Sequence, residues 1–226
     1  MPKHLQREIE NLKKKILDLG ARIETVVHEA IRSIEKRDVV SAQKIIDEDI
    51  EIDHTEVEVE EDCLKILALY QPVAIDLRFI VAILKINSDL ERIGDLGVNI
   101  AERSVFLASV PKVNASLDFA RMSKKTESML NRCLDALVNM SSKLANEVCA
   151  DDDEVDAMNR QMYLRIQETM QEYPDQVPSL IHLLSVSRHL ERIADHACNI
   201  AEDVIYLVEG EIARHQRKTQ PESRRP

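Results

Sequence analysis

A short acidic phrase occurs twice in this chain, and this repeat constrains the fold more than any other feature. Residues 90–102 read LERIGDLGVNIAE, and residues 190–202 read LERIADHACNIAE. Self-similarity at a fixed spacing indicates a duplicated structural unit. Because the polar positions recur in register, we also expect both halves to keep the same surface chemistry.

The composition around this repeat predicts an all-α fold. The 226 residues include only four glycines and seven prolines, and 31% of them are charged. Chains poor in turn-forming residues and rich in good helix formers are typically helical. Apolar periodicity predicts helices over about residues 4–36, 39–70, 72–109 and 117–148. A fifth helix should be capped by the acidic run 151–154, and a sixth should follow the turn between Pro174 and Pro178 and end near residue 215.

Two similar halves of three helices each follow from this order. Pro111 and Asn114 mark the linker between them. The simplest packing is two elongated three-helix bundles, in tandem and pseudo-symmetric, lying side by side. We therefore expect a first three-helix repeat over residues 1–110, a second over residues 111–215, and a disordered tail over residues 216–226.

Several classes of function fit this sequence poorly. A net charge of −11 argues against a nucleic-acid-binding surface, which needs a basic face. No apolar run reaches the ~18 residues that a membrane span requires, so membrane contact is expected only through protein partners. The four dispersed cysteines fit a reduced compartment, and we expect a cytoplasmic protein. The sequence has no glycine-rich phosphate loop, no GxSxG motif and no zinc motif, so we expect no enzyme.

The repeated phrase places an acidic stripe on a helix. At ~100° per residue, Glu91, Asp95, Asn99 and Glu102 fall within an arc of about 80°, opposite the apolar positions. The same positions recur in the second copy as Glu191, Asp195, Asn199 and Glu202. The stripe is therefore predicted to face outward, and a solvated acidic surface is its simplest interpretation.

A second acidic row has a different setting. Asp49, Asp53, Glu56 and Glu60 recur at i, i+4, i+7 and i+11 in the helix over residues 39–70. One flank of this row carries Ile45, Ile52, Val59 and Cys63, and the other carries Ile46, Ile50, Val57 and Leu64. The row is thus predicted to run along the middle of an apolar packing face, and Asp152 and Asp156 repeat it more weakly.

Carboxylates on a packing face are costly unless a cation accompanies them. Arginine is one candidate, because Arg92 and Arg192 lie beside the stripes and Arg78 and Lys85 lie on the same side. A metal ion is the other, and sites built only from oxygen favour hard cations such as Mg, Ca, Mn or ferric iron. The residues alone leave a metal site, an ion-pair network and a solvated face all open. A metal-storage protein or metal-dependent enzyme stays as the alternative function, although a ferritin-like di-iron site needs two ExxH motifs and only Glu51–His54 provides one.

The chain combines the segment ALYQPVAIDLR, over residues 68–78, with two later Glu-Arg-Ile-x-Asp strings and two Asn-Ile-Ala-Glu strings. This combination resembles the PhoU family of phosphate-uptake regulators over essentially the whole chain. The resemblance implies two similar three-helix bundles and a homodimer in the bacterial cytoplasm. It also implies a negative regulator of phosphate uptake and of phosphate-regulon signalling. Such a protein would act as an adaptor between the ATPase of a phosphate ABC transporter and a sensor histidine kinase.

The resemblance also implies site residues, because some family members carry multinuclear iron or zinc clusters on their acidic motifs. The expected metal ligands are Asp49, Asp53, Glu91, Asp95 and Asn99 in the first half, and Asp152, Asp156, Glu191, Asp195 and Asn199 in the second. Partner binding is expected at Glu91, Arg92, Asp95 and Glu102, and at Glu191, Arg192, Asp195 and Glu202. Asn159 and Tyr163 replace Glu56 and Glu60, so we expect the first half to hold the better site, and the second to bind less tightly or to take a different ion.

Overall fold

The computed structural model describes residues 3–113 and 117–210, and over these ranges the chain is built from α-helices and one short 3₁₀ helix. The helices are α1 (Lys3–Lys36), α2 (Val39–Tyr70), α3 (Ile75–Ser109), α4 (Phe119–Asn139), α5 (Ser142–Glu172), η1 (Pro174–Gln176) and α6 (Val177–Glu209). This confirms the all-α prediction. The last helix ends at Glu209, before Gly210 in the left-handed conformation at φ 79°, and not near residue 215 as predicted. The predicted tail over residues 216–226 lies outside the described residues. Within the described ranges, no helix combines the length and apolar character that crossing a bilayer requires.

The boundary between α2 and α3 differs from the prediction by a short loop. α3 begins at Ile75 rather than at Pro72, which lies buried before the helix. Gln71 and Ala74 have positive φ angles of 45° and 50°, so the backbone leaves the helical region on both sides of Pro72. The proline therefore belongs to the turn that reverses the chain and not to the first turn of α3.

The boundary between α4 and α5 was predicted wrongly. α4 ends at Asn139 instead of near residue 148, and α5 already begins at Ser142. Met140 takes the left-handed conformation, and the Ser141 hydroxyl accepts a hydrogen bond from the Leu144 amide at 3.3 Å. Serine is a strong N-cap residue, so this cap starts the helix. The acidic run 151–154 consequently lies inside α5, where Asp151 pairs with Arg132 and with Lys125 of α4.

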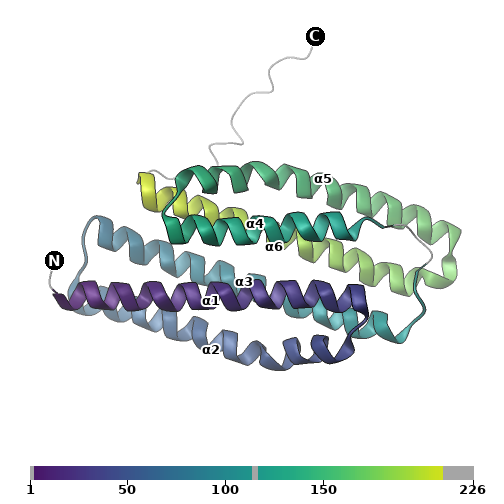
Figure 1. Ribbon diagram of the computed structural model, residues 1–226, viewed down its shortest axis with the longest axis horizontal. Coiled ribbons are helices and arrows are strands. Elements are labelled where there is room, and N and C mark those ends of the chain that lie inside the picture. The colour runs from purple at the N-terminus through teal and green to yellow at the C-terminus, as the bar shows by residue number, and fades with distance from the viewer. Residues whose placement is uncertain (1–2, 114–116, 211–226) are drawn as a thin grey trace, which may run out of the picture.

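The two sets of three helices lie side by side, as the repeat predicts (Figure 1). α3 contacts α6 and α1 contacts α4, so these pairs join the halves, while α2 and α5 form opposite edges of the molecule. One continuous cluster of buried apolar side chains includes residues from both halves. Gly97 lets α1 approach α3 closely. A Cβ atom at this position would lie only 2.7 Å from Val26 Cγ1.

Polar contacts between α3 and α6 also cross the boundary between the halves. Lys85 Nζ lies 3.3 Å from Asp203 Oδ1, and Asp203 is only 2% exposed. His196 Nδ1 lies 2.8 Å from Asp89 Oδ1, and the Asn199 amide donates to the same oxygen at 3.3 Å. Lys85 thus contacts the other half, instead of serving the acidic stripe as the sequence suggested.

We predict that Lys85→Met lowers the free energy of unfolding by about 1–3 kcal/mol, because the buried Asp203 carboxylate loses its lysine partner. Lys44→Met is the matched control, since Lys44 and Glu48 form an exposed pair at 3.7 Å and such pairs contribute little. Urea denaturation of the two variants measures the difference. Equal unfolding free energies would show that the Lys85–Asp203 contact adds nothing to stability.

Candidate functional site

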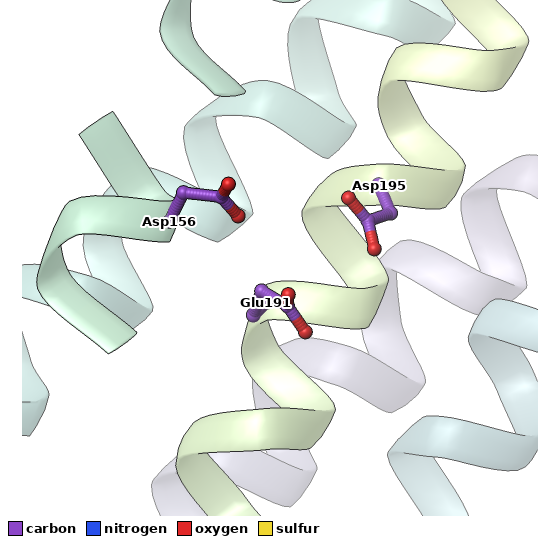
Figure 2. A group of neighbouring side chains, drawn as sticks. All are labelled: Asp156, Glu191 and Asp195. Carbon is purple, nitrogen blue, oxygen red and sulfur yellow. The ribbon is translucent and has the colours of Figure 1, made fainter. Parts of the chain in front are cut away.

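Three carboxylates from two helices meet in the second half. Asp156 lies on α5, and Glu191 and Asp195 lie one turn apart on α6, with the α5 carboxylate directed toward the two on α6 (Figure 2). One oxygen from each side chain lies within 4.8 Å of the other two. Asp156 and Glu191 are half-buried and Asp195 is exposed. The group is therefore open to solvent on one side and supported by the helix pair on the other.

This arrangement disfavours ionisation of the carboxylates. Although part of the Asp195 side chain reaches solvent, desolvation by the neighbouring helices, and then repulsion by Glu191 and Asp156, raises the pKa of its carboxyl group to about 6. Burial, and then the charges of Asp195 and Asp156, raises the pKa of Asp152 to about 6 as well. The pKa of Glu191 is also raised, first by burial and then by Asp156. Like charges held this close favour either a proton or a cation between them.

Arginines offset part of this charge. Arg160 Nη1 lies 3.5 Å from Asp156 Oδ2 in an exposed pair. Arg188 and Arg192 act against the rise in the pKa of Glu191 without reversing it. Oxygen ligands at this separation suit a hard divalent or trivalent cation, and zinc also accepts carboxylate ligands. The donor set therefore fits a cation, with Asp156, Glu191 and Asp195 as the residues that would hold it.

The corresponding residues of the first half are also near one another, but less tightly. Burial raises the pKa of Asp49, with Asp53 and Asp95 as the next causes. Burial and then Asp95 raise the pKa of Glu91. Within residues 3–113, however, no three of these carboxylates bring their oxygens within 4.8 Å of one another.

The geometry favours the second half as the cation site, contrary to the expectation from carboxylate number. In the first half, Arg92 lies 3.4 Å from a carboxylate oxygen of Glu91 and 3.4 Å from one of Asp95. This guanidinium neutralises part of the charge of the two α3 carboxylates. The greater number of acidic residues in the first half is thus matched by an arginine that already pairs with two of them.

The two asparagines of the repeated phrase make other contacts. The Asn99 amide donates to the backbone oxygen of Asp95 at 2.7 Å, and the Asn199 amide donates to Asp89 across the boundary between the halves. Neither contact joins the asparagine to the three-carboxylate group. These contacts use the amide nitrogens, so the side-chain oxygens that would bind a metal ion are not engaged by them and the ligand role of both residues stays a prediction.

The sequence predicted that the acidic row of α2 runs along the middle of its packing face. In the structure the row lies at the edge of that face. Its first flank, which includes Ile52 and Val59, is buried. The second flank points outward: Ile50, Val57 and Leu64 are 59%, 49% and 53% exposed. α2 contacts only α1 and α3 among the described elements, so no helix covers this second flank.

A pair of buried polar contacts recurs in both halves and was missed from the sequence. The Asn87 amide donates to the backbone oxygen of Glu56 at 2.9 Å and to its carboxylate at 3.1 Å. At the corresponding place, the Ser187 hydroxyl donates to Asn159 Oδ1 at 2.7 Å. These contacts fix α2 on α3 and α5 on α6. The signal available in the sequence was a polar residue at the same otherwise apolar position of both repeats.

The residues expected to bind partners form one charged face in each half. Arg92, Glu102 and Arg192 are exposed, while Glu202 is half-buried. Arg103 lies 3.8 Å from Glu102. Of the eight stripe residues only Glu102 and Asp195 are exposed and the other six are half-buried, so the fully outward, solvated stripe that the sequence predicted is found only in part. The single ExxH motif is also exposed at both Glu51 and His54, on the solvent side of α2.

Comparison with known proteins relates this geometry to one family. The PhoU domain matches residues 16–104 and 119–204, once in each half. The phosphate-specific transport system accessory protein PhoU homolog of Aquifex aeolicus is 39% identical over 212 residues, which are 94% of this chain and 96% of that protein.

Two solved structures share the fold. The crystal structure of PhoU from Pseudomonas aeruginosa has a TM-score of 0.89 at 33% identity, covering 91% of this chain and 99% of that one. The phosphate transport system regulatory protein PhoU from Streptococcus pneumoniae has a TM-score of 0.81 at 31% identity, covering 92% of this chain and 98% of that one. Matches of this extent, in both halves and over the acidic motifs, establish that the chain belongs to the PhoU family.

Proposed function

We propose that this protein is an accessory regulator of phosphate transport that works by binding other proteins rather than by catalysis. It represses phosphate uptake and phosphate-regulon signalling from the cytoplasm, as a homodimer. It does so as an adaptor between a phosphate ABC transporter ATPase and a sensor histidine kinase. The observation that carries the proposal is the match of both halves to the PhoU domain, with the acidic motifs intact in each. The names of relatives that match nearly the whole chain support the link to phosphate transport.

The arrangement of the acidic faces supports an adaptor. An adaptor must hold two partners, and the repeated stripe gives one charged face to α3 and another to α6. Fixed surface charges of one sign direct complementary partners and fix their orientation more than they add affinity. The faces centred on Glu91 and Asp95, and on Glu191 and Asp195, are accordingly the docking surfaces of this proposal.

A bound cation is part of the same proposal. Asp156, Glu191 and Asp195 hold it, in a mononuclear site or as part of an iron or zinc cluster, or with Mg, Mn or Ca as the ion. Burial and then repulsion raise the pKa of Asp195, and a cation that shares the oxygens would offset both. The ion would then link α5 to α6 and change the charge that the second face presents to a partner.

We expect Glu91→Lys/Asp95→Lys to relieve repression, because a reversed charge repels the partner that the α3 face attracts. A phosphate-responsive reporter in cells grown at high phosphate should rise toward the level of cells that lack the protein. Asp135→Lys/Glu147→Lys reverses two exposed charges outside the stripe and is the matched control. Normal repression by the Glu91/Asp95 variant, with its helical content unchanged, would defeat the docking claim.

Metal content tests the cation site. Protein purified without chelator, and protein reconstituted with iron, zinc, manganese or magnesium, should contain bound metal by elemental analysis. Asp156→Asn/Glu191→Gln/Asp195→Asn should lose it, whereas Asp53→Asn/Glu91→Gln/Asp95→Asn should keep the metal of the second half. A stoichiometry near zero in every wild-type sample rules out the site, and equal loss in both variants contradicts its assignment to the second half.

Stability should depend on pH when a chelator removes any cation. Asp152 and Asp195 have a pKa of about 6 in the folded protein, above the ordinary value of 3.8. The folded state therefore keeps protons that the unfolded state releases, so stability falls as the pH rises from about 4 to about 6. Asp152→Asn/Asp195→Asn should be about 1 kcal/mol more stable than wild type above pH 6, after allowance for solvent screening. Urea denaturation across this range measures the gain, and a wild-type curve parallel to that of the variant would contradict it.

A metal-storage protein or metal-dependent enzyme is the competing function, and the three-carboxylate group is the observation that favours it. The exposed position of the single ExxH motif weighs against a di-iron centre. Turnover of ferrous iron with oxygen separates the two functions. Oxidation of many irons per protein would support storage or catalysis, whereas a stoichiometric or absent reaction is expected of the regulator.

A further inference from the structure

We propose that the outward face of α2 is a docking surface for a basic amphipathic helix of another protein. The surface is centred on Ile50, Val57 and Leu64, named here the α2 seam. All three side chains are large, apolar and about half exposed. That the occupant is a protein rests on the adaptor role proposed above. The basic, amphipathic character of that occupant is the new part of the inference.

The spacing of the seam suits a helix. Residues seven apart drift by only ~20° around an α-helix, so the three side chains form one nearly straight row. The row is ~21 Å long at ~1.5 Å per residue, which is the length of four turns. Scattered apolar residues are common on protein surfaces. Three exposed apolar side chains seven residues apart form a narrow row along which the apolar face of an amphipathic partner helix can lie.

The other half shows that the fold does not require this seam. The repeat aligns Asp49 and Asp53 of α2 with Asp152 and Asp156 of α5. In the same register the buried positions agree, since Ile52 and Val59 correspond to the buried Val155 and Met162. The seam positions do not agree: their counterparts are Asp153, Arg160 and Gln167. The same scaffold thus packs with polar residues at these positions, and the seam serves something other than the core.

The charge around the seam identifies the occupant. Asp53, Glu60 and Glu61 lie beside it and are exposed. The only basic side chains of α2 apart from His54 are Lys44 and Lys65. A second copy of this face would therefore place carboxylates against carboxylates, and like charges brought together at an interface cost several kcal/mol. Anionic lipid and nucleic acid are repelled for the same reason, whereas a helix with Lys or Arg beside its apolar stripe complements the surface.

A groove beside one end of the seam adds a place for an anchoring side chain. It lies between α1 and α2, has a volume of about 790 Å³, and is lined by residues that include Ala21, Val26 and Ile50. Asp47, Glu48 and Glu51 line it as well, together with Arg22, so its rim carries three carboxylates and one guanidinium and stays acidic. An apolar side chain at the end of the partner helix would enter this groove, with basic residues close to the acidic rim.

Two synthetic peptides of about three heptads test the proposal, since that length spans the seam. Both carry leucine at the seam-facing positions, one with lysine flanks and one with glutamate flanks. We expect the lysine peptide to bind the full chain at least about tenfold more tightly than the glutamate peptide, by fluorescence anisotropy. The variant Ile50→Ser/Val57→Ser/Leu64→Ser should raise the dissociation constant of the lysine peptide at least about tenfold. The control Tyr163→Ser/Leu164→Ser removes exposed apolar side chains from α5 and should change that constant less than about twofold.

Equal binding of the lysine peptide to wild type and to the seam variant, with unchanged helical content, would overturn the proposal. A concentration-dependent dimer in sedimentation velocity that only the seam variant abolishes would also overturn it, because a second copy would then be the occupant. The peptide assay involves no phosphate signalling, and the reporter assay with Glu91 and Asp95 involves no peptide. Failure of the seam and failure of the regulatory function are therefore seen separately.

Discussion

The packing of α5 against α6 holds three carboxylates together against their mutual repulsion, and the proposed cation site rests on this arrangement. The buried apolar cluster fixes α5 against α6, and this packing keeps Asp156 near Glu191 and Asp195 although their charges oppose it. Burial first, and then repulsion by Glu191 and Asp156, raises the pKa of Asp195 to about 6. A cation between these oxygens would relieve that cost, which is why the proposed function places one there.

The two halves use one scaffold for different surfaces. In the second half the carboxylates converge, whereas in the first half Arg92 pairs with two of them. The first half instead exposes the apolar side chains of the α2 seam, and polar residues take those positions on α5. Contacts between the halves depart from the repeat as well, since Asp203 replaces the counterpart Arg103 and pairs with Lys85. Duplication supplied the fold, and substitutions at a few positions gave each half its own chemistry.

Sequence periodicity predicted an all-helical chain and the buried side of α3 and α6, but not every helix boundary or which faces lie against a neighbour. The break between α4 and α5 has no glycine or proline, and only the Ser141 cap marks it, so the acidic run was mistaken for a helix start. The apolar arc of α2 was identified, yet helical angles cannot say that its second flank lies at an edge of the molecule. The number of carboxylates favoured the first half as the cation site. That count overlooked the contact of Arg92 with Glu91 and Asp95, because the contact depends on side-chain rotamers, which residue spacing does not predict.

Direct titration of the Asp152 and Asp195 carboxyl groups tests this account most closely. Carbon-detected NMR of the side-chain carboxyl signals, in the presence of a chelator, should give a pKa of about 6 for both residues. Magnesium and calcium are diamagnetic hard cations that leave the NMR signals visible. If the site binds one of them, its addition should lower the pKa of both residues. A pKa near the ordinary value of 3.8 without any cation would contradict the account, because the carboxyl groups would then be neither desolvated nor held near like charges.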